Sequence, residues 1–241
     1  MQNWIGTSGF QYAEWKGTFY PEKLPASKML GFYAEHFSTT EINYTFRRIP
    51  SAQTIQRWAE GTPARFTFSL KAPQRITHFS KLRDCGDTLR FFYSVVSALG
   101  EKLGPVLFQL PPSFKKDVPL LSDFLREFPA GMRAAFEFRN VSWFADETYA
   151  ALEQAGVALC VADSEKIQAP EVTTAKYGYL RLRREDYQEP DLQRWAEFVR
   201  QQRDKWSEAF IYFKHEESGM GPKLAAQMMT ELEHGDRSGS D

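Results

Sequence analysis

The run Phe66-Thr67-Phe68-Ser69-Leu70-Lys71 indicates the fold class, because large apolar side chains alternate along it with polar ones. Alternation with a period of two is the pattern of a β-strand whose two faces meet different surroundings. We expect the Phe and Leu positions to face a layer of helices, and the Thr, Ser and Lys positions to face the inside of a barrel. Lys71, the last residue of the run, is then predicted to point into the barrel mouth.

Seven other short runs are also rich in β-branched or aromatic residues, and segments with helical spacing separate most of them. The eight predicted strands are Trp4–Thr7, Thr39–Ile42, Phe66–Leu70, Val106–Leu110, Ala134–Phe138, Val157–Val161, Gly178–Leu182 and Ala209–Phe213. The predicted helices are Ser27–Phe37, Ala52–Ala59, Asp87–Leu99, Leu120–Glu127, Asp146–Ala155, Leu192–Trp206 and Gly221–Glu233. Eight strands that alternate with helices in 241 residues predict an α/β protein with a TIM-like (β/α)8 barrel.

The connection between the sixth and seventh strands departs from this alternation. Residues 164–176 contain Pro170 and several β-branched residues without a helical pattern, so we expect an irregular crossover there. No linker or change of composition divides the chain, and we predict a single barrel domain over residues 1–232. Residues 233–241 are polar and rich in Gly and Ser, which predicts a flexible C-terminal tail.

The composition argues against several classes of protein. The 30 basic residues nearly balance the 31 acidic ones, so no net field attracts nucleic acid or an anionic membrane. The two cysteines, Cys85 and Cys160, show no metal-binding or redox spacing. No run reaches the roughly 20 apolar residues that span a bilayer, and residues 1–10 lack the pattern of a signal peptide. We therefore expect a cytoplasmic protein without membrane contacts, and the sequence indicates no oligomeric state.

Polar side chains at the strand ends predict the place of the functional site. In barrels of this kind the C-terminal ends of the strands converge on one mouth, which carries the chemistry. The strand-end residues are Glu41, Asn43, Lys71, Gln109, Glu137, Arg139, Asp163, Arg181 and Lys214. Alternation directs Phe136, Phe138, Leu180 and Leu182 outward, and it directs Glu137, Arg139, Arg181 and Arg183 inward.

Glu41 and Glu137 are candidates for proton transfer, since two carboxylates on non-adjacent strands can flank a substrate. Glu137 has Arg139 two residues further on the same face, so it could equally serve as the partner of that arginine. Glu41 has Asn43 at the equivalent place, which leaves its charge unpaired, and we expect Glu41 to be the proton acceptor. Lys71 is a third catalytic candidate, because a lysine whose pKa is lowered by neighbouring cations can form a Schiff base.

Basic residues around the same mouth predict a small anionic ligand. The cations expected to converge there are Lys71, Arg75, His78, Arg139 and Arg181. Such a cluster binds phosphate or carboxylate through charge-assisted hydrogen bonds, although the acidic strand ends could satisfy the same charges. Further substrate-binding candidates are Ser8, in the turn Gly6-Thr7-Ser8-Gly9, together with Asn43, Gln109 and Asp163.

Metal and nucleotide cofactors are not indicated. Only His78 and His215 of the four histidines are expected near the mouth, which is too few for a multi-zinc site. A Mg²⁺ ion could be held by Glu41, Glu137 and Asp163, since this ion needs only a few carboxylates besides ligand oxygens. The sequence shows no Walker loop, dinucleotide fingerprint or GxSxG elbow. We therefore predict no cofactor, with Mg²⁺ as the one exception that the carboxylates would permit.

Several motifs along the chain resemble blocks of the domain of unknown function 72, or YecE-like, family. These motifs are Ile5-Gly6-Thr7-Ser8-Gly9-Phe10, Phe19-Tyr20-Pro21, Glu41-Ile42-Asn43, Phe68-Ser69-Leu70-Lys71-Ala72-Pro73, Leu107-Phe108-Gln109-Leu110-Pro111-Pro112 and Glu137-Phe138-Arg139. They stand in the family's order and cover nearly the whole chain. The resemblance implies a TIM-barrel-like fold, which agrees with the strand count, and it implies no activity, because the family's role is unassigned.

Three functions remain compatible with these patterns. The first is an enzyme, such as a lyase, isomerase or hydrolase, that uses general acid/base chemistry on a small phosphorylated or carboxylated substrate. The second is a barrel that binds or processes nucleic acid, with Trp15, Tyr20 and Tyr44 stacking on bases. The third is a barrel that binds a metabolite without catalysis.

Overall fold

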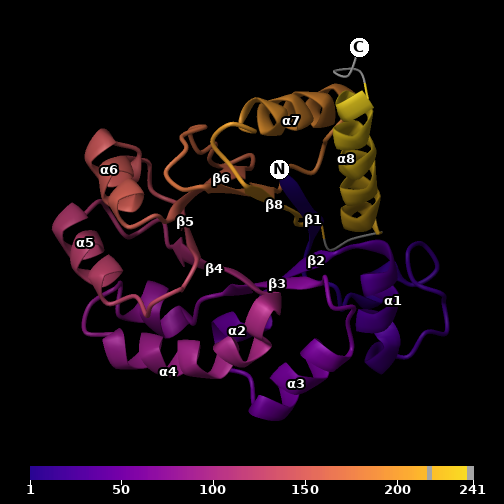
Figure 1. The fold of residues 1–241 in the computed structure, drawn as a ribbon, viewed down its shortest axis with the longest axis horizontal. Coiled ribbons are helices and arrows are strands. Elements are labelled where there is room, and N and C mark those ends of the chain that lie inside the picture. The colour runs from indigo at the N-terminus through magenta and orange to yellow at the C-terminus, as the bar shows by residue number, and fades with distance from the viewer. Residues whose placement is uncertain (216–218, 238–241) are drawn as a thin grey trace.

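Eight parallel strands form a closed barrel in chain order in the computed structural model, which describes residues 1–215 and 219–237 (Figure 1). The strands are β1 Gln2–Ser8, β2 Thr39–Ile42, β3 Thr67–Lys71, β4 Leu103–Leu110, β5 Ala134–Phe138, β6 Ala158–Asp163, β7 Tyr177–Leu182 and β8 Glu208–Phe213. Each strand pairs with the next, and β8 pairs with β1 over six residue pairs, which closes the ring. The predicted TIM-like (β/α)8 barrel is confirmed.

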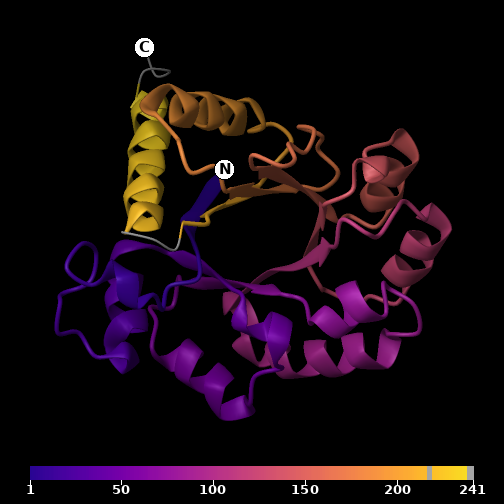
Figure 2. The same ribbon diagram turned by 180° about the vertical axis from the view of Figure 1, so that it is seen from behind.

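Helices surround the barrel on its outer side, as the two opposite views show (Figures 1 and 2). They are α1 Met29–His36, α2 Tyr44–Arg47, α3 Ala52–Glu60, α4 Gly86–Val96, α5 Val118–Arg126, α6 Asp146–Gln154, α7 Glu189–Gln201 and α8 Met220–Arg237. The short helix α2 was not predicted. Helix α7 begins earlier than predicted, because Gln188 and Asp191 form a capping box and Pro190 fits the first turn.

The segment between β6 and β7 contains no helix, which confirms the predicted irregular crossover. An isolated bridge between Asp163 and Gln168 folds this segment back onto the end of β6. The backbone N–H of Ala169 also donates to the carbonyl of Ala162, at 2.8 Å. The crossover therefore runs back along the strand that it leaves.

Helix α8 continues to Arg237, so residues 233–237 of the predicted tail belong to the helix, and residues 238–241 lie outside the described residues. The helix packs beside α7 and β1 (Figure 1). Within residues 1–215 and 219–237, no helix combines the length and the apolar character needed to cross a bilayer.

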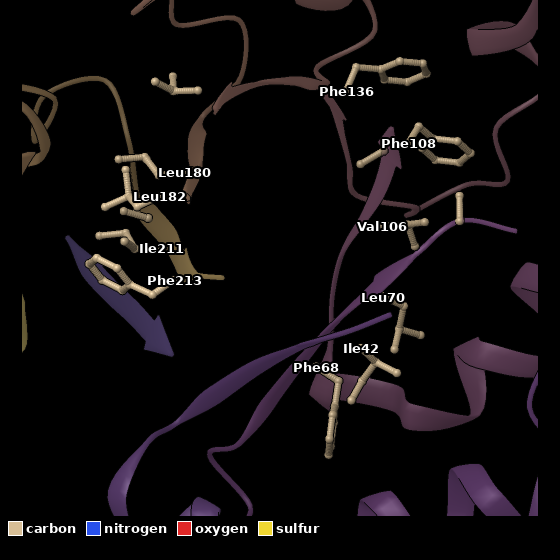
Figure 3. Packing of buried hydrophobic residues seen from close by; sticks show 14 of the residues in the cluster. Ile42, Phe68, Leu70, Val106, Phe108, Phe136, Leu180, Leu182, Ile211 and Phe213 are labelled. Carbon is tan, nitrogen blue, oxygen red and sulfur yellow. The ribbon is translucent and has the colours of Figure 1, made fainter. Parts of the chain in front are cut away.

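Two apolar clusters lie on the two sides of the strands. The outer cluster joins barrel to helices and includes every residue predicted to face outward: Phe66, Phe68, Leu70, Phe136, Phe138, Leu180 and Leu182 (Figure 3). The inner cluster consists of Leu107, Ala135, Ala158, Cys160, Ala162, Tyr177, Tyr179, Phe210 and Tyr212. In this inner cluster the small side chains of β5 and β6 leave room for the large ones of β7 and β8, which fills the barrel. Glu41, Gln109, Glu137 and Arg181 lie near the C-terminal ends of the strands, next to this inner cluster.

Candidate functional site

Arg181 of β7 is the centre of a buried ion network at the mouth of the barrel. Its Nε donates to Glu41 Oε2 at 2.9 Å, and its Nη2 donates to Glu41 Oε1 at 2.8 Å. Its Nη1 donates to Oε2 of Glu137. All three side chains are almost completely buried. Arg181 therefore forms ion pairs with carboxylates from β2 and β5 at once.

Glu41 receives further hydrogen bonds on both oxygens. The hydroxyl of Ser8 donates to Oε1, and the hydroxyl of Tyr179 donates to Oε2 at 2.7 Å. Burial by itself would raise the pKa of Glu41, but the charge of Arg181 and the hydrogen bonds from Arg181, Ser8 and Tyr179 hold that pKa below its ordinary value. Glu41 stays ionised with both oxygens occupied, which weighs against the role of proton acceptor expected for it.

Glu137 is held in a similar way by β4, β5 and β7. Gln109 Nε2 donates to Oε2 at 2.8 Å, Arg139 Nε donates to Oε1 at 3.0 Å, and Arg183 Nη1 lies 3.8 Å from Oε1. Burial would raise the pKa of Glu137, yet Arg181 and Arg139 hold it far below its ordinary value. Two roles were considered for Glu137, which are proton transfer and pairing with Arg139. The structure shows the pairing with Arg139.

Lys71 ends β3 beside this network, as its place in the alternating run predicted. Its Nζ donates to Gln109 Oε1 at 2.9 Å and lies 4.1 Å from the ring centroid of Phe46. Burial, followed by the charge of Arg181, lowers the pKa of Lys71 to about 7, although Glu137 and Glu41 oppose the shift. A large fraction of Lys71 is then the neutral amine at pH 7, which is the form that accepts a proton or attacks a carbonyl.

Asn43 and His78 lie next to the network, whereas Arg75 does not contact it. Asn43 Nδ2 donates to the hydroxyl of Ser8 at 2.8 Å. The ring of His78 meets Phe46 edge-on at 4.9 Å, and burial together with the charges of Lys71 and Arg139 lowers the pKa of His78. Arg75 is exposed on the same π-helical turn as His78, and its side chain contacts no hydrogen-bond or ion-pair partner among the described residues.

Asp163 points away from the barrel mouth, so its predicted place in the site is wrong. Its Oδ2 accepts a hydrogen bond from the hydroxyl of Tyr187 at 2.7 Å, and Tyr187 packs against Phe213 on the outer side of the barrel. In β6 the inward positions are Cys160 and Ala162, so Asp163 has outward parity.

The predicted ligand set for Mg²⁺ does not form, because Asp163 is separated from the other two acids. Both oxygens of Glu41 and both of Glu137 receive hydrogen bonds from arginine or its neighbours. Within the described part of the chain, no three His, Cys, Asp or Glu side chains gather where they could hold a metal ion. The two carboxylates at the mouth form ion pairs with arginine side chains instead.

The comparison with protein families matches the description "Protein of unknown function DUF72" over residues 4–240. The chain belongs to the DUF72 family. Among curated relatives, the UPF0759 protein YecE of Escherichia coli K12 is 33% identical over 143 residues, which are 57% of this chain and 53% of YecE. The UPF0759 protein YunF of Bacillus subtilis is 32% identical over 142 residues, which are 55% of this chain and 50% of YunF. The matches to these DUF72 relatives thus span about half of their length.

Solved structures of DUF72 proteins share the fold. The crystal structure of a DUF72 protein from Thermotoga maritima has a TM-score of 0.87 and 29% sequence identity, and it covers 97% of this chain and 100% of its own. A DUF72 protein from Enterococcus faecalis, with 18% identity, has a TM-score of 0.80 and 96% coverage of both chains. The barrel is therefore a property of the DUF72 family, and neither relative's description names a reaction.

Two of the three aromatic residues that the nucleic-acid hypothesis needs are buried in this DUF72 chain. Trp15 packs against Tyr12, Phe19 and Tyr20, and the hydroxyl of Tyr20 donates to the carbonyl of Phe10. Trp15 and Tyr20 are thus core residues of the β1–α1 loop and cannot stack on bases. Tyr44, of which 49% is exposed, is the one member of this set that a ligand could reach.

Three residues of the site were not among the predicted site residues. Arg183 was predicted to face inward but was given no role, and Tyr179 has the same inward parity, so alternation carried a signal for both. Phe46 comes from the short helix α2, and no periodicity marks it. Its contact with Lys71 depends on the tertiary fold.

A groove of about 930 Å³ lies beside the mouth, outside the charged network. It is lined by Gly9–Tyr12, by parts of helices α1 and α3, and by Ile42–Tyr44. Asn43 is the only predicted site residue on its walls. We place the candidate site at the network rather than in this groove, because the network contains Lys71 with its lowered pKa and the partly exposed guanidinium groups of Arg139 and Arg183.

Proposed function

We propose that this DUF72 protein is an enzyme that moves a proton on a small phosphorylated or carboxylated substrate at the barrel mouth, with Lys71 as the base. The observation that carries this proposal is the environment of the Lys71 amine. Burial and neighbouring guanidinium groups lower the pKa of Lys71 to about 7. A lysine with the ordinary pKa of 10.5 would be protonated at neutral pH and could not accept a proton.

An excess of positive charge in the mouth supports an anionic substrate. The network contains four basic side chains, Lys71, Arg139, Arg181 and Arg183, and two carboxylates, Glu41 and Glu137. Arg181 is enclosed by its two carboxylate partners, so the accessible cations are Arg139 and Arg183, joined by Lys71 when it is protonated. A bound anion would offset their mutual repulsion and form charge-assisted hydrogen bonds with them.

The proposed step uses Lys71 and its neighbours as follows. The neutral amine accepts a proton from a C–H or O–H group of the substrate and becomes an ammonium ion. Gln109 Oε1, at 2.9 Å, already accepts a hydrogen bond from this nitrogen, and Gln109 Nε2 is fixed on Glu137. The ammonium ion then returns the proton to the product or to water. A lyase, an isomerase or a hydrolase could each use this step.

The first experiment measures thermal unfolding of the full chain against sugar phosphates, small carboxylates, nucleotides and short oligonucleotides. A ligand at 100 times its dissociation constant adds about 2.7 kcal/mol of stability, which raises the midpoint by roughly 5–10 °C for a chain of this size. Stabilisation by oligonucleotides alone, with a steep dependence on salt, would contradict the proposal and favour nucleic-acid binding.

The second experiment tests the proton transfer itself. Ligands that stabilise the protein are incubated with it in D2O, and deuterium incorporation or turnover is followed by NMR. We expect exchange with the natural chain and with Lys16→Met, which removes an exposed lysine elsewhere, and none with Lys71→Met. If every stabilising ligand bound without exchange or turnover, the result would contradict the enzyme proposal. It would favour a barrel that binds a metabolite without catalysis.

A further inference from the structure

Two guanidinium groups from different strand ends meet at one oxygen of Glu137. Arg139 follows β5 and Arg183 follows β7. Arg139 Nε lies 3.0 Å from Glu137 Oε1, and Arg183 Nη1 lies 3.8 Å from the same atom. The two side chains are 29% and 24% exposed, so their outer edges reach the solvent in the mouth. Glu137 thus holds a pair of cations side by side that would otherwise repel each other.

The remaining N–H groups of this pair have no hydrogen-bond partner among the described residues. Within residues 1–215 and 219–237, the two terminal nitrogens of Arg139 donate to no side chain or backbone oxygen, and Nε of Arg183 is buried without a hydrogen bond. The neighbouring Arg184 differs, because it is paired with Asp186 at 3.0 Å and with Asp191 at 3.1 Å. Buried donors are rarely left unpaired, and such a donor in a mouth points to a ligand oxygen.

The charge of the network distinguishes between classes of anion. With Lys71 as the neutral amine, three guanidinium groups and two carboxylates leave one positive charge, and protonation of Lys71 raises this to two. A phosphoryl group carries up to two negative charges on three terminal oxygens, so it can accept from two guanidinium groups at once and can also pair with the ammonium ion that Lys71 becomes. A carboxylate carries one charge on two oxygens, which one arginine satisfies. Phosphate sites in TIM barrels are also frequent at the loops after strands 7 and 8, where Arg183 lies.

We propose that Arg139 and Arg183 form a clamp for the phosphoryl group of the substrate, with Glu137 holding the two guanidinium groups in position. This inference rests on the proposed function in naming a substrate, and it narrows that substrate to a phosphorylated one. Arg181 lies buried beneath the clamp and does not contact the ligand. Lys71 lies on the other side of Gln109 and faces the part of the substrate that reacts.

The test measures binding of inorganic phosphate and of acetate to the full chain by isothermal titration calorimetry. We expect phosphate to bind and acetate to bind at least tenfold more weakly. Arg139→Gln and Arg183→Gln should each weaken phosphate binding by about tenfold or more, since each removes a charge-assisted hydrogen bond. Arg184→Gln is the matched control and should leave phosphate affinity unchanged, because Arg184 is occupied by Asp186 and Asp191.

Thermal unfolding distinguishes an arginine that binds phosphate from one that only stabilises the fold. Without phosphate, Arg183→Gln should keep or raise the unfolding midpoint, because it removes a repelling charge and leaves Glu137 paired with Arg181 and Arg139. With phosphate, the same variant should lose the stabilisation that the natural chain gains. A lower midpoint without phosphate, equal affinity for acetate, unchanged phosphate affinity in Arg183→Gln, or no phosphate binding at all would each overturn the clamp.

The clamp and the proposed function can fail separately. Phosphate binding that requires Arg139 and Arg183, combined with no deuterium exchange on any bound phosphate ester, would retain the clamp and reject Lys71 as a base. Exchange that requires Lys71, on a carboxylated ligand whose binding is insensitive to Arg183→Gln, would retain the base and reject the clamp.

Discussion

Arg181 and Glu41 lie 140 positions apart in the chain and are joined by two hydrogen bonds, of 2.9 Å from Nε to Oε2 and 2.8 Å from Nη2 to Oε1. This bidentate pair connects β7 to β2 across the inside of the barrel. Arg181 also donates to Glu137, so removal of this one side chain would leave two buried carboxylates without their principal partner. The mouth therefore has a structural layer beneath its candidate chemical groups.

Arg181→Met should destabilise the protein by about 3–5 kcal/mol, because it leaves uncompensated charge in a buried site. Glu41 would keep only the hydroxyls of Ser8 and Tyr179. Urea unfolding of the variant and the natural chain measures the difference. Arg184→Met, which breaks pairs that involve exposed aspartate, is the control and should cost about 1 kcal/mol or less. A loss below about 1 kcal/mol in Arg181→Met would mean that the network contributes no stability.

The stability of the protein should fall in acid because of Glu41 and Glu137. Their folded-state pKa values lie below the ordinary 4.5, so their contribution is complete above about pH 5 and is lost as the pH falls through 4.5 toward the folded values. Between pH 6 and pH 3 Glu137, whose folded pKa lies far below its ordinary value, should account for a loss of about 2 kcal/mol. Glu137→Gln should therefore lose about 2 kcal/mol less than the natural chain over this range, measured by urea unfolding at both pH values. An identical pH dependence would show that Glu137 has an ordinary pKa.

Alternation along single strands predicted much of this arrangement. The outward Phe and Leu positions of β3, β5 and β7 fixed the inward direction of Lys71, Glu137 and Arg181. The same reasoning was not available for Asp163, because β6 is apolar on both faces. Its signal was weaker: Leu159 and Val161, which share parity with Asp163, are larger than the alternating Cys160 and Ala162.

Roles of the ionisable groups could not be predicted, because they depend on pairs formed across the barrel. The sequence has Asn43 two residues after Glu41, just beyond β2, which suggested an unpaired carboxylate. The fold brings Arg181 and Tyr179 to Glu41 from β7, and these contacts lower its pKa. In the same way, the low pKa of Lys71 arises from burial and from Arg181, and neither is visible within its strand.

Lys71→Met should stabilise the protein, and the gain should depend on pH. Lys71 has a pKa of about 7 in the folded chain and 10.5 as its ordinary value, so the natural chain becomes more stable as the pH rises from about 7 to 10.5. The advantage of the variant over the natural chain should be larger at pH 6 than at pH 10.5 by about 4 kcal/mol. Urea unfolding at pH 6, 8 and 10 measures this difference. A constant difference across the three values would contradict the lowered pKa of Lys71.

Gly31→Ala should stabilise the protein by about 0.5–1 kcal/mol. Gly31 lies within helix α1, where glycine costs conformational entropy, and a Cβ placed there would meet no atom within 4 Å. Gly6→Ala is the opposing control, because its Cβ would lie 2.1 Å from the carbonyl oxygen of Thr39, where β1 approaches β2. It should destabilise the chain by about 1–3 kcal/mol, since packed strands do not separate freely. Thermal unfolding should show a rise of a few degrees for Gly31→Ala and a fall for Gly6→Ala; a fall in both would mean that α1 needs the glycine.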